Sequence, residues 1–262
     1  MSKTLFLFVQ MPYKNYSSNE SLEGYGIDYT ESNFNRIVAG VNEKQIPCYD
    51  LRDEKTKWEF FRTDHHWTVN SAFMAAGNIV SELNKQYELG LDETEELREV
   101  ANYYGEKYPK SLLGSTGIQV GEYYIKKDDF NILLPRFETD LQYSHYISGN
   151  MNAQFEGDFK STFINEELLK DKNYYNKYNA CLYGGWNENH VINYKSENDL
   201  KCFLVTNSYG RPMTQYLSLY FKELRYLDPQ PGRYNDNYVV YIEEYQPDVV
   251  IIMYDDEINT GN

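Results

Sequence analysis

Three short runs of mostly apolar residues constrain the fold of this chain more than any other feature. They cover residues 5–11, 200–205 and 249–253, and each has the length of a strand that is buried on both faces. Strands of this kind belong to parallel sheets whose two faces are covered by helices. The runs therefore predict an α/β fold with a largely parallel central sheet.

The segments beside these runs carry apolar residues at helical spacing. One helix is predicted over residues 69–87 with Thr68 as its N-cap, and a short strand is predicted over residues 46–51. Between Gly90 and about Tyr194 the pattern loosens, which predicts an irregular insertion of short strands and loops that forms a wall of the site. We expect one domain over residues 1–262. The residues that mark the other predicted helices are Phe34, Ile37, Val38 and Val41, then Pro212, Met213, Tyr216, Leu217 and Tyr220, then Tyr238, Ile242 and Tyr245.

Charge and composition narrow the class of partner. With 25 basic and 40 acidic residues the formal net charge is −15, which argues against binding to nucleic acid or to an anionic membrane surface. The 27 tyrosines suit a partly wet groove for carbohydrate, although codon usage explains such a composition equally well. Three cysteines without a CxxC spacing indicate neither a disulfide framework nor a zinc site. No apolar run approaches the ~20 residues that span a bilayer.

Two polar segments far apart in the sequence carry the groups of a catalytic triad. Asp64 precedes His66 by two residues at the entrance of the predicted helix over residues 69–87. Ser208 lies on a turn after the predicted strand over residues 200–205, where ligands bind in open α/β sheets. We predict that Ser208 is the nucleophile, His66 the general base and Asp64 the group that orients it. Spacing alone does not separate His66 from His65, which we place beside it.

The turn around Ser208 also predicts a site for an oxyanion. The backbone N–H groups of Ser208, Tyr209 and Gly210 would point toward an acyl carbonyl at the start of a helix. Four residues that flank the catalytic groups are assigned to substrate binding: His65, Trp67, Asn207 and Arg211. Among them, Trp67 would exclude water and Arg211 would contact an anionic group of the substrate. The simpler alternative makes Ser208 and Asp64 ordinary helix-capping residues, with one histidine stacked on Trp67.

A metal site is the second chemical alternative. Asp64, His65 and His66 would need His145 or His190 to complete a ligand set. Adjacent histidines seldom point at one centre, and no carboxylate-rich motif accompanies them. We therefore predict neither a metal nor a cofactor.

Several motifs along the chain resemble one known family. They are Phe60 to Thr68 (FFRTDHHWT), Leu113-Gly114-Ser115 with Gly117, Asp128-Asp129-Phe130, Pro135 with Phe137, Ser208-Tyr209-Gly210, and Tyr245 to Val250 (YQPDVV). Their order resembles the DHHW family of bacterial proteins, which are relatives of the SGNH-hydrolase-like domains of alginate O-acetyltransferases. The resemblance implies an SGNH-hydrolase-like three-layer sandwich in which Ser208, His66 and Asp64 are catalytic.

The resemblance also implies a function and a place. Relatives of this family transfer acetyl groups to cell-envelope or secreted polysaccharides, often beside a membrane-bound acyltransferase, so the expected address is extracytoplasmic. An N-terminal anchor would be expected too, and it is absent from this chain. Asn207 departs from the aspartate that usually precedes the serine. Two hypotheses follow: a serine O-acetyltransferase or acetylesterase that acts on a polysaccharide, and a catalytically degenerate glycan-binding or assembly module.

Overall fold

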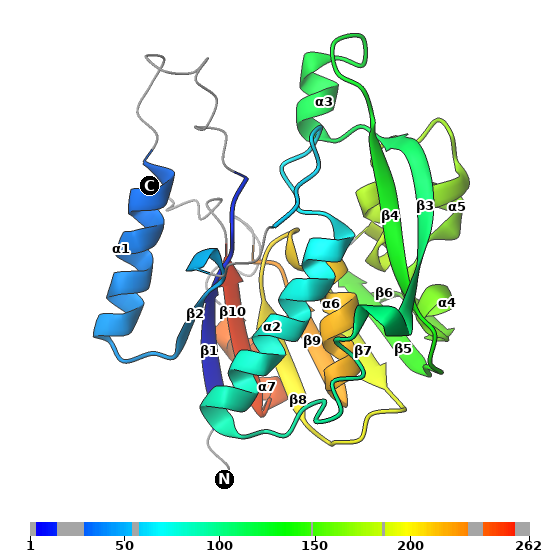
Figure 1. The fold of residues 1–262 in the computed structure, drawn as a ribbon. Coiled ribbons are helices and arrows are strands. Elements are labelled where there is room, and N and C mark those ends of the chain that lie inside the picture. The colour runs from blue at the N-terminus through cyan, green and yellow to red at the C-terminus, as the bar shows by residue number, and fades with distance from the viewer. Residues whose placement is uncertain are drawn as a thin grey trace.

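The computed structural model describes residues 4–14, 29–53, 58–147, 149–184, 187–229 and 238–254. Its centre is an eight-stranded sheet in the order β2-β1-β10-β8-β9-β7-β5-β6 (Figure 1). The first five strands in this order run parallel, and the last three are antiparallel to their neighbours. The strands are β1 (Leu5–Gln10), β2 (Cys48–Asp50), β5 (Leu141–Ile147), β6 (Asn150–Gly157), β7 (Glu188–Asn193), β8 (Lys201–Val205), β9 (Glu223–Leu227) and β10 (Val249–Tyr254).

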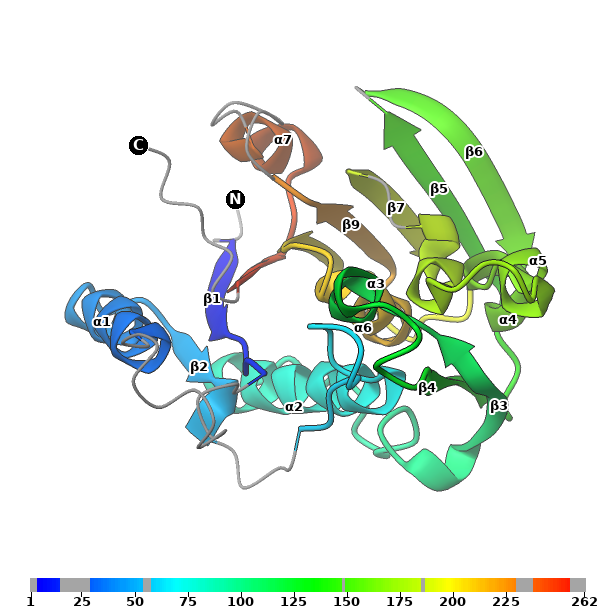
Figure 2. The same ribbon diagram turned by 90° about the horizontal axis from the view of Figure 1, so that it is seen from above.

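Helices cover the parallel half of the sheet on both faces. Figure 2 shows α2 (Val69–Tyr87) and α6 (Gly210–Leu217) on one face and α7 (Tyr238–Tyr245) on the other, with α1 (Thr30–Glu43) beside the edge strand β2. Because side chains alternate along β1, Leu7 belongs to the large core under α2, and Phe6 packs against the smaller core under α7. The predicted α/β fold with a mostly parallel central sheet is confirmed.

The segment between residues 90 and 194, for which the sequence predicts short strands and loops, is built from two parts. The first is a separate antiparallel ribbon of β3 (Tyr103–Leu112) and β4 (Asp128–Pro135), with α3 (Ser115–Val120) in the connection between them. The second comprises β5, β6 and β7, which continue the main sheet, together with the short helices α4 (Phe159–Phe163) and α5 (Glu166–Lys170). One-turn 3-10 helices lie at Leu51–Asp53, Val100–Asn102, Lys177–Ala180, Leu182–Gly184 and Ser218–Tyr220.

Two connections at the carboxyl edge of the parallel strands position the site. The first leads into α2, where the Thr68 side chain accepts a hydrogen bond from Ser71 N at 3.3 Å as the predicted N-cap. The second joins β8 to α6, where a Cβ added to Gly210 would lie 2.2 Å from Thr206 Cγ2, so only glycine allows this close turn. No helix in the described part of the chain is long and apolar enough to cross a membrane.

Candidate active site

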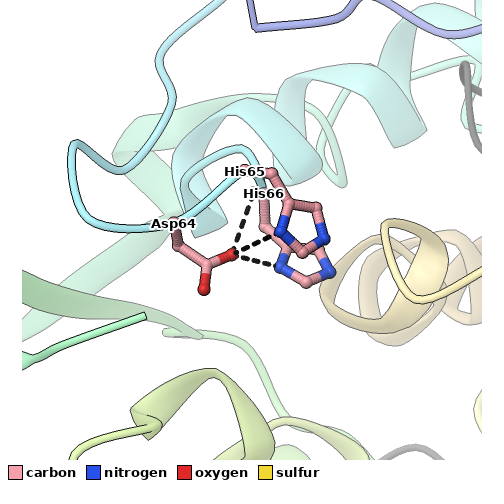
Figure 3. Close-up of side chains that lie close together, drawn as sticks. All are labelled: Asp64, His65 and His66. Atoms are coloured by element: carbon pink, nitrogen blue, oxygen red, sulfur yellow. Dashed lines mark hydrogen bonds and ion pairs between the residues drawn. The ribbon is translucent and has the colours of Figure 1, made fainter. Parts of the chain in front are cut away.

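Asp64, His66 and Ser208 form a continuous hydrogen-bonded chain. The Nδ1–H of His66 donates to Asp64 Oδ1, which also accepts the backbone N–H of His66 at 3.0 Å (Figure 3). On the other side of the ring, His66 Nε2 lies 2.8 Å from Ser208 Oγ. Asp64 and His66 are buried, and the Ser208 side of the chain is partly accessible. Non-helical backbone between Asp64 and Trp67 permits this bond between residues only two positions apart.

The carboxylate of Asp64 is held on both oxygens. Its Oδ2 accepts the backbone N–H of Ser115 at 2.8 Å, at the first residue of α3. A Cβ added to Gly114 would lie 2.0 Å from this same oxygen, so glycine is required for the approach. The neighbouring Thr63 donates its N–H and its hydroxyl to Asp128 Oδ2, each at 2.7 Å. The LGS and DDF motifs thus serve to position Asp64.

Lys14 fastens the same loop to the end of β1. Its ammonium donates to the backbone carbonyls of Phe61, Arg62 and Asp64 at 2.6, 3.0 and 2.9 Å. Burial lowers the pKa of this ammonium, while Asp128 and Asp64 act in the opposite direction. Lys14 therefore crosslinks a central strand to the loop that carries the candidate base. Sequence reasoning did not select it, because a lone lysine after a strand gives no pattern.

The turn around Ser208 uses most of its own N–H groups. Asn207 Oδ1 accepts the N–H of Tyr209 at 3.2 Å, and Asn207 O accepts that of Gly210 at 3.0 Å. The side chain of Asn207 thus closes an Asx turn, which an aspartate would also close. Of the three N–H groups assigned to an oxyanion, only that of Ser208 makes no hydrogen bond within the described residues. The expectation that Tyr209 and Gly210 donate there therefore does not fit this conformation.

Aromatic rings enclose the imidazole of His66. Tyr178 stacks on it with ring centres 4.2 Å apart, and the Tyr178 hydroxyl donates to Ser208 O at 3.3 Å. Trp67 was expected to exclude water, but its ring is fully buried beneath the site, where its N–H donates to Tyr209 O at 3.0 Å. Trp67 therefore supports the Ser208 turn through this hydrogen bond to Tyr209 O. Tyr178, from the loosely patterned middle segment, takes the place next to the base.

His65 lies beside the base and contacts a different serine. Its Nδ1 is 3.0 Å from Ser115 Oγ and 3.6 Å from Asp64 Oδ1, and its ring centre is 4.0 Å from that of His66 (Figure 3). Since His65 faces Ser115 and His66 faces Ser208, the geometry separates the two histidines. The Tyr209 hydroxyl donates to His65 O at 2.6 Å, which fixes the loop against the turn.

The metal alternative is only partly compatible with the structure. Ligand atoms of Asp64, His65 and His66 lie within 4.8 Å of one another. His145 and His190, the proposed additional ligands, lie in β5 and β7, where His190 Nε2 is 3.0 Å from Glu223 Oε2. A metal at the first three residues would have to displace the proton between Asp64 and His66, and it would gain no further histidine.

Burial and hydrogen bonding set the charges of the pair. Burial lowers the pKa of His66 to about 4, although its hydrogen bond to Asp64 acts in the opposite direction. For Asp64, burial would raise the pKa, but the hydrogen bonds and charge of His66 together with the N–H of Ser115 hold it below its ordinary value. At neutral pH the site therefore has a neutral imidazole beside a carboxylate. This is the state in which a histidine accepts a proton from a serine hydroxyl.

Comparisons with known proteins show what the chain resembles in sequence and in fold. Residues 3–113 match the sequence model of a family described as SGNH hydrolase-like domain, acetyltransferase AlgX. The chain has an SGNH hydrolase-like fold. The resemblance to that family and to DHHW proteins is confirmed. No curated protein sequence matches it significantly.

Solved structures share the fold over nearly the whole chain. Bacillus cereus PatB1 superimposes with a TM-score of 0.74 at 19% identity, covering 99% of this chain and 85% of that one. PatB1 with a sulfonyl adduct gives a TM-score of 0.72 at 17% identity, covering 99% and 84%. A DHHW family protein from Eubacterium siraeum gives 0.66 at 16% identity, covering 100% and 80%.

Proposed function

We propose that this chain is an SGNH-like serine O-acetyltransferase or acetylesterase that acts on a cell-envelope or secreted polysaccharide. The observation that carries the proposal is the hydrogen-bonded chain from Asp64 through His66 to Ser208, with 2.8 Å between His66 Nε2 and Ser208 Oγ. A neutral buried imidazole next to a serine hydroxyl is the arrangement that activates serine toward acyl groups. The match to the AlgX acetyltransferase family supports acetyl as the acyl group.

In the first half of the proposed reaction, Ser208 Oγ attacks the carbonyl carbon of an acetyl ester. The hydroxyl proton passes to His66 Nε2, the carbonyl π electrons move to the oxygen, and Asp64 stabilises the imidazolium. When the tetrahedral intermediate collapses, the bond to the donor oxygen breaks and that oxygen takes the proton from His66. The donor leaves as an alcohol, and Ser208 carries the acetyl group.

In the second half, an acceptor hydroxyl takes the place of the donor. His66 removes its proton while the acceptor oxygen attacks the acetyl-serine, and the proton returns to Ser208 Oγ as that bond breaks. A sugar hydroxyl as acceptor gives transfer, and water gives hydrolysis. We propose a polysaccharide as acceptor, a membrane-bound acyltransferase as the source of acetyl groups, and a location outside the cytoplasm, in line with the family resemblance.

Covalent labelling by a fluorophosphonate tests this function. The wild-type protein should gain one adduct on the peptide that contains Ser208, and both Ser208→Ala and His66→Ala should lose it. Ser144→Ala, which removes a buried serine in β5, is the matched control and should label like the wild type.

Unlabelled wild-type protein would then be assayed with an acetyl ester, with and without oligosaccharide, and the sugar would be examined by mass spectrometry for an added acetyl group. Protein that was first labelled at Ser208 should be inactive in the same assay. A wild-type protein that folds, binds glycan and gains no adduct would contradict the enzyme and favour the glycan-binding module.

A further inference from the structure

Arg211 is a cation beside the candidate active site, and none of the described carboxylates pairs with it. It is the second residue of α6, three positions after Ser208. Its Nη1 donates to Asn179 Oδ1 at 2.6 Å, and it forms no ion pair with any carboxylate in the described part of the chain. Arg52, Arg98 and Arg225 each lie within ion-pair distance of a carboxylate. Arg62 and Arg136 also lack an ion pair within the described residues, and they donate to the backbone carbonyls of Lys126 and Tyr103. Arg211 differs from them by its place next to the candidate base.

The three nitrogens of this guanidinium differ in their surroundings. Nη1 is bound to Asn179, whose own amide donates to the Tyr174 hydroxyl at 2.6 Å and so is fixed in orientation. Nε is buried without an acceptor. Nη2 is neither hydrogen-bonded nor among the buried atoms, so it faces solvent. A partly buried guanidinium held by one amide, with one N–H edge open, is preorganised to meet an anionic oxygen.

The ring of Tyr178 links this guanidinium to the reacting groups. Arg211 Cζ lies 5.7 Å from the centre of that ring, and the ring stacks on His66 at 4.2 Å. The Tyr178 hydroxyl donates to the carbonyl of Ser208. The charge is also close enough to His66 to lower its pKa, together with His65. Arg211 is thus connected to both His66 and Ser208 through contacts with one tyrosine.

The turn after β8 uses the N–H groups of Tyr209 and Gly210 for its own hydrogen bonds. Of the three N–H groups predicted to hold an oxyanion, only that of Ser208 is therefore left within the described residues. We propose that the Arg211 guanidinium supplies the second donor and stabilises the negative oxygen of the tetrahedral intermediate. The inference rests on the proposed function, and it makes Arg211 a catalytic residue of that reaction.

The inference is tested on the full chain with p-nitrophenyl acetate as the probe, comparing Arg211→Gln and Arg211→Lys with the wild type. Removing a donor to an oxyanion lowers kcat by about 100-fold or more and leaves KM nearly unchanged, since the donor acts in the transition state. Arg211→Lys should retain more activity than Arg211→Gln. Added guanidinium ions at millimolar concentration should restore part of the kcat of Arg211→Gln. A purely structural role for Arg211 would not produce that rescue.

Binding of phenylboronic acid adds a second readout, because the boronate adduct on Ser208 carries a negative oxygen in tetrahedral geometry. Its affinity should fall in Arg211→Gln in proportion to kcat. Arg98→Gln is the matched control: the Nε of Arg98 is also buried without a hydrogen bond, but it lies 3.6 Å from Asp92. This variant should keep the wild-type kcat, KM and boronate affinity.

Unchanged kcat and boronate affinity in Arg211→Gln would overturn the inference while leaving the function in place. A raised KM with unchanged kcat would also overturn it, since Arg211 would then bind the substrate in its ground state. A wild-type protein that gains no adduct at Ser208 would instead overturn the proposed function, and the inference would fall with it.

Discussion

The charge state of His66 is decided by its immediate neighbours. Tyr178 on one face and His65 on the other remove water from the ring, and Asp64 accepts the proton of Nδ1. Removal of water favours the neutral ring and the carboxylate favours the charged one, and the first effect is the larger. A base that is neutral well below pH 7 can work over a wide pH range.

The pH dependence of labelling follows from this balance. Because burial lowers the pKa of His66 to about 4, the rate of fluorophosphonate labelling should fall on acidification with a midpoint near 4. The folded pKa lies below the unfolded value of 6.5, so the contribution of His66 to stability is complete above 6.5 and decreases as the pH falls toward 4. Labelling rates and urea unfolding between pH 3.5 and 8, roughly the span in which an imidazole titrates, measure both effects. A labelling midpoint near 6.5 would mean that the ring is solvated.

Gly114→Ala should inactivate the protein without unfolding it. The added methyl would lie 2.0 Å from Asp64 Oδ2, so the carboxylate must move and lose its bond to Ser115. We expect labelling at Ser208 to slow by at least about tenfold, which is less than the loss seen when a triad member is removed. Gly40→Ala, at a glycine of α1 with open space around it, serves as the control. Equal labelling of the two variants would contradict the positioning role of Gly114.

Only those residues of the site that stand in local sequence motifs could be predicted. Asp64, His66 and Ser208 stand in short motifs whose order and spacing carry chemical meaning, and the structure brings them together. Tyr178 and Lys14 reach the site from segments that are far from it in the sequence and show no motif. Their contribution depends on tertiary packing, which local patterns do not contain.

Some helices and strands could be predicted from the local sequence pattern, and others could not. The helix predicted over residues 69–87 with Thr68 as N-cap is confirmed as α2. The predicted strand over residues 249–253 is confirmed as β10. By contrast, β5 points Tyr143 and His145 inward and buries Ser144 as well, so its alternation of polar and apolar residues is obscured. Its place in the main sheet depends on pairing with β7, across a separation in sequence that no local pattern encodes.

Loss of the Lys14 ammonium should loosen the loop that leads into α2 and carries Asp64. Lys14→Ala removes three hydrogen bonds to carbonyl oxygens, and we expect it to destabilise the fold by about 2 kcal/mol, given the strength of such bonds to charged groups. Urea denaturation measures this loss. Lys85→Ala, at an exposed lysine of α2 that pairs with Glu82, should cost well under half as much. A loss for Lys14→Ala no larger than that of Lys85→Ala would mean that the three bonds contribute little.

At the scale of the whole molecule, the eight-stranded sheet joins strands from early, middle and late parts of the described chain. Only the ribbon of β3 and β4 forms a separate sheet among the described residues, and β5, β6 and β7 from the same middle segment belong to the main sheet. We therefore predict that urea unfolds the protein in one cooperative transition. Tryptophan fluorescence, to which the buried Trp67 contributes, and far-ultraviolet circular dichroism should give the same midpoint. Two midpoints would show that residues 90–194 unfold as a separate unit.

The position of β1 in the sheet affects how the protein folds during its synthesis. β1 is synthesised long before β10, yet it pairs over its whole length with that strand, with Leu5 opposite Val249 and Gln10 opposite Tyr254. Until β10 has been made, one edge of this apolar strand has no partner. Such late closure invites aggregation, and a chaperone would shield the strand during that interval. The same delay means that the main sheet cannot close until synthesis has reached β10.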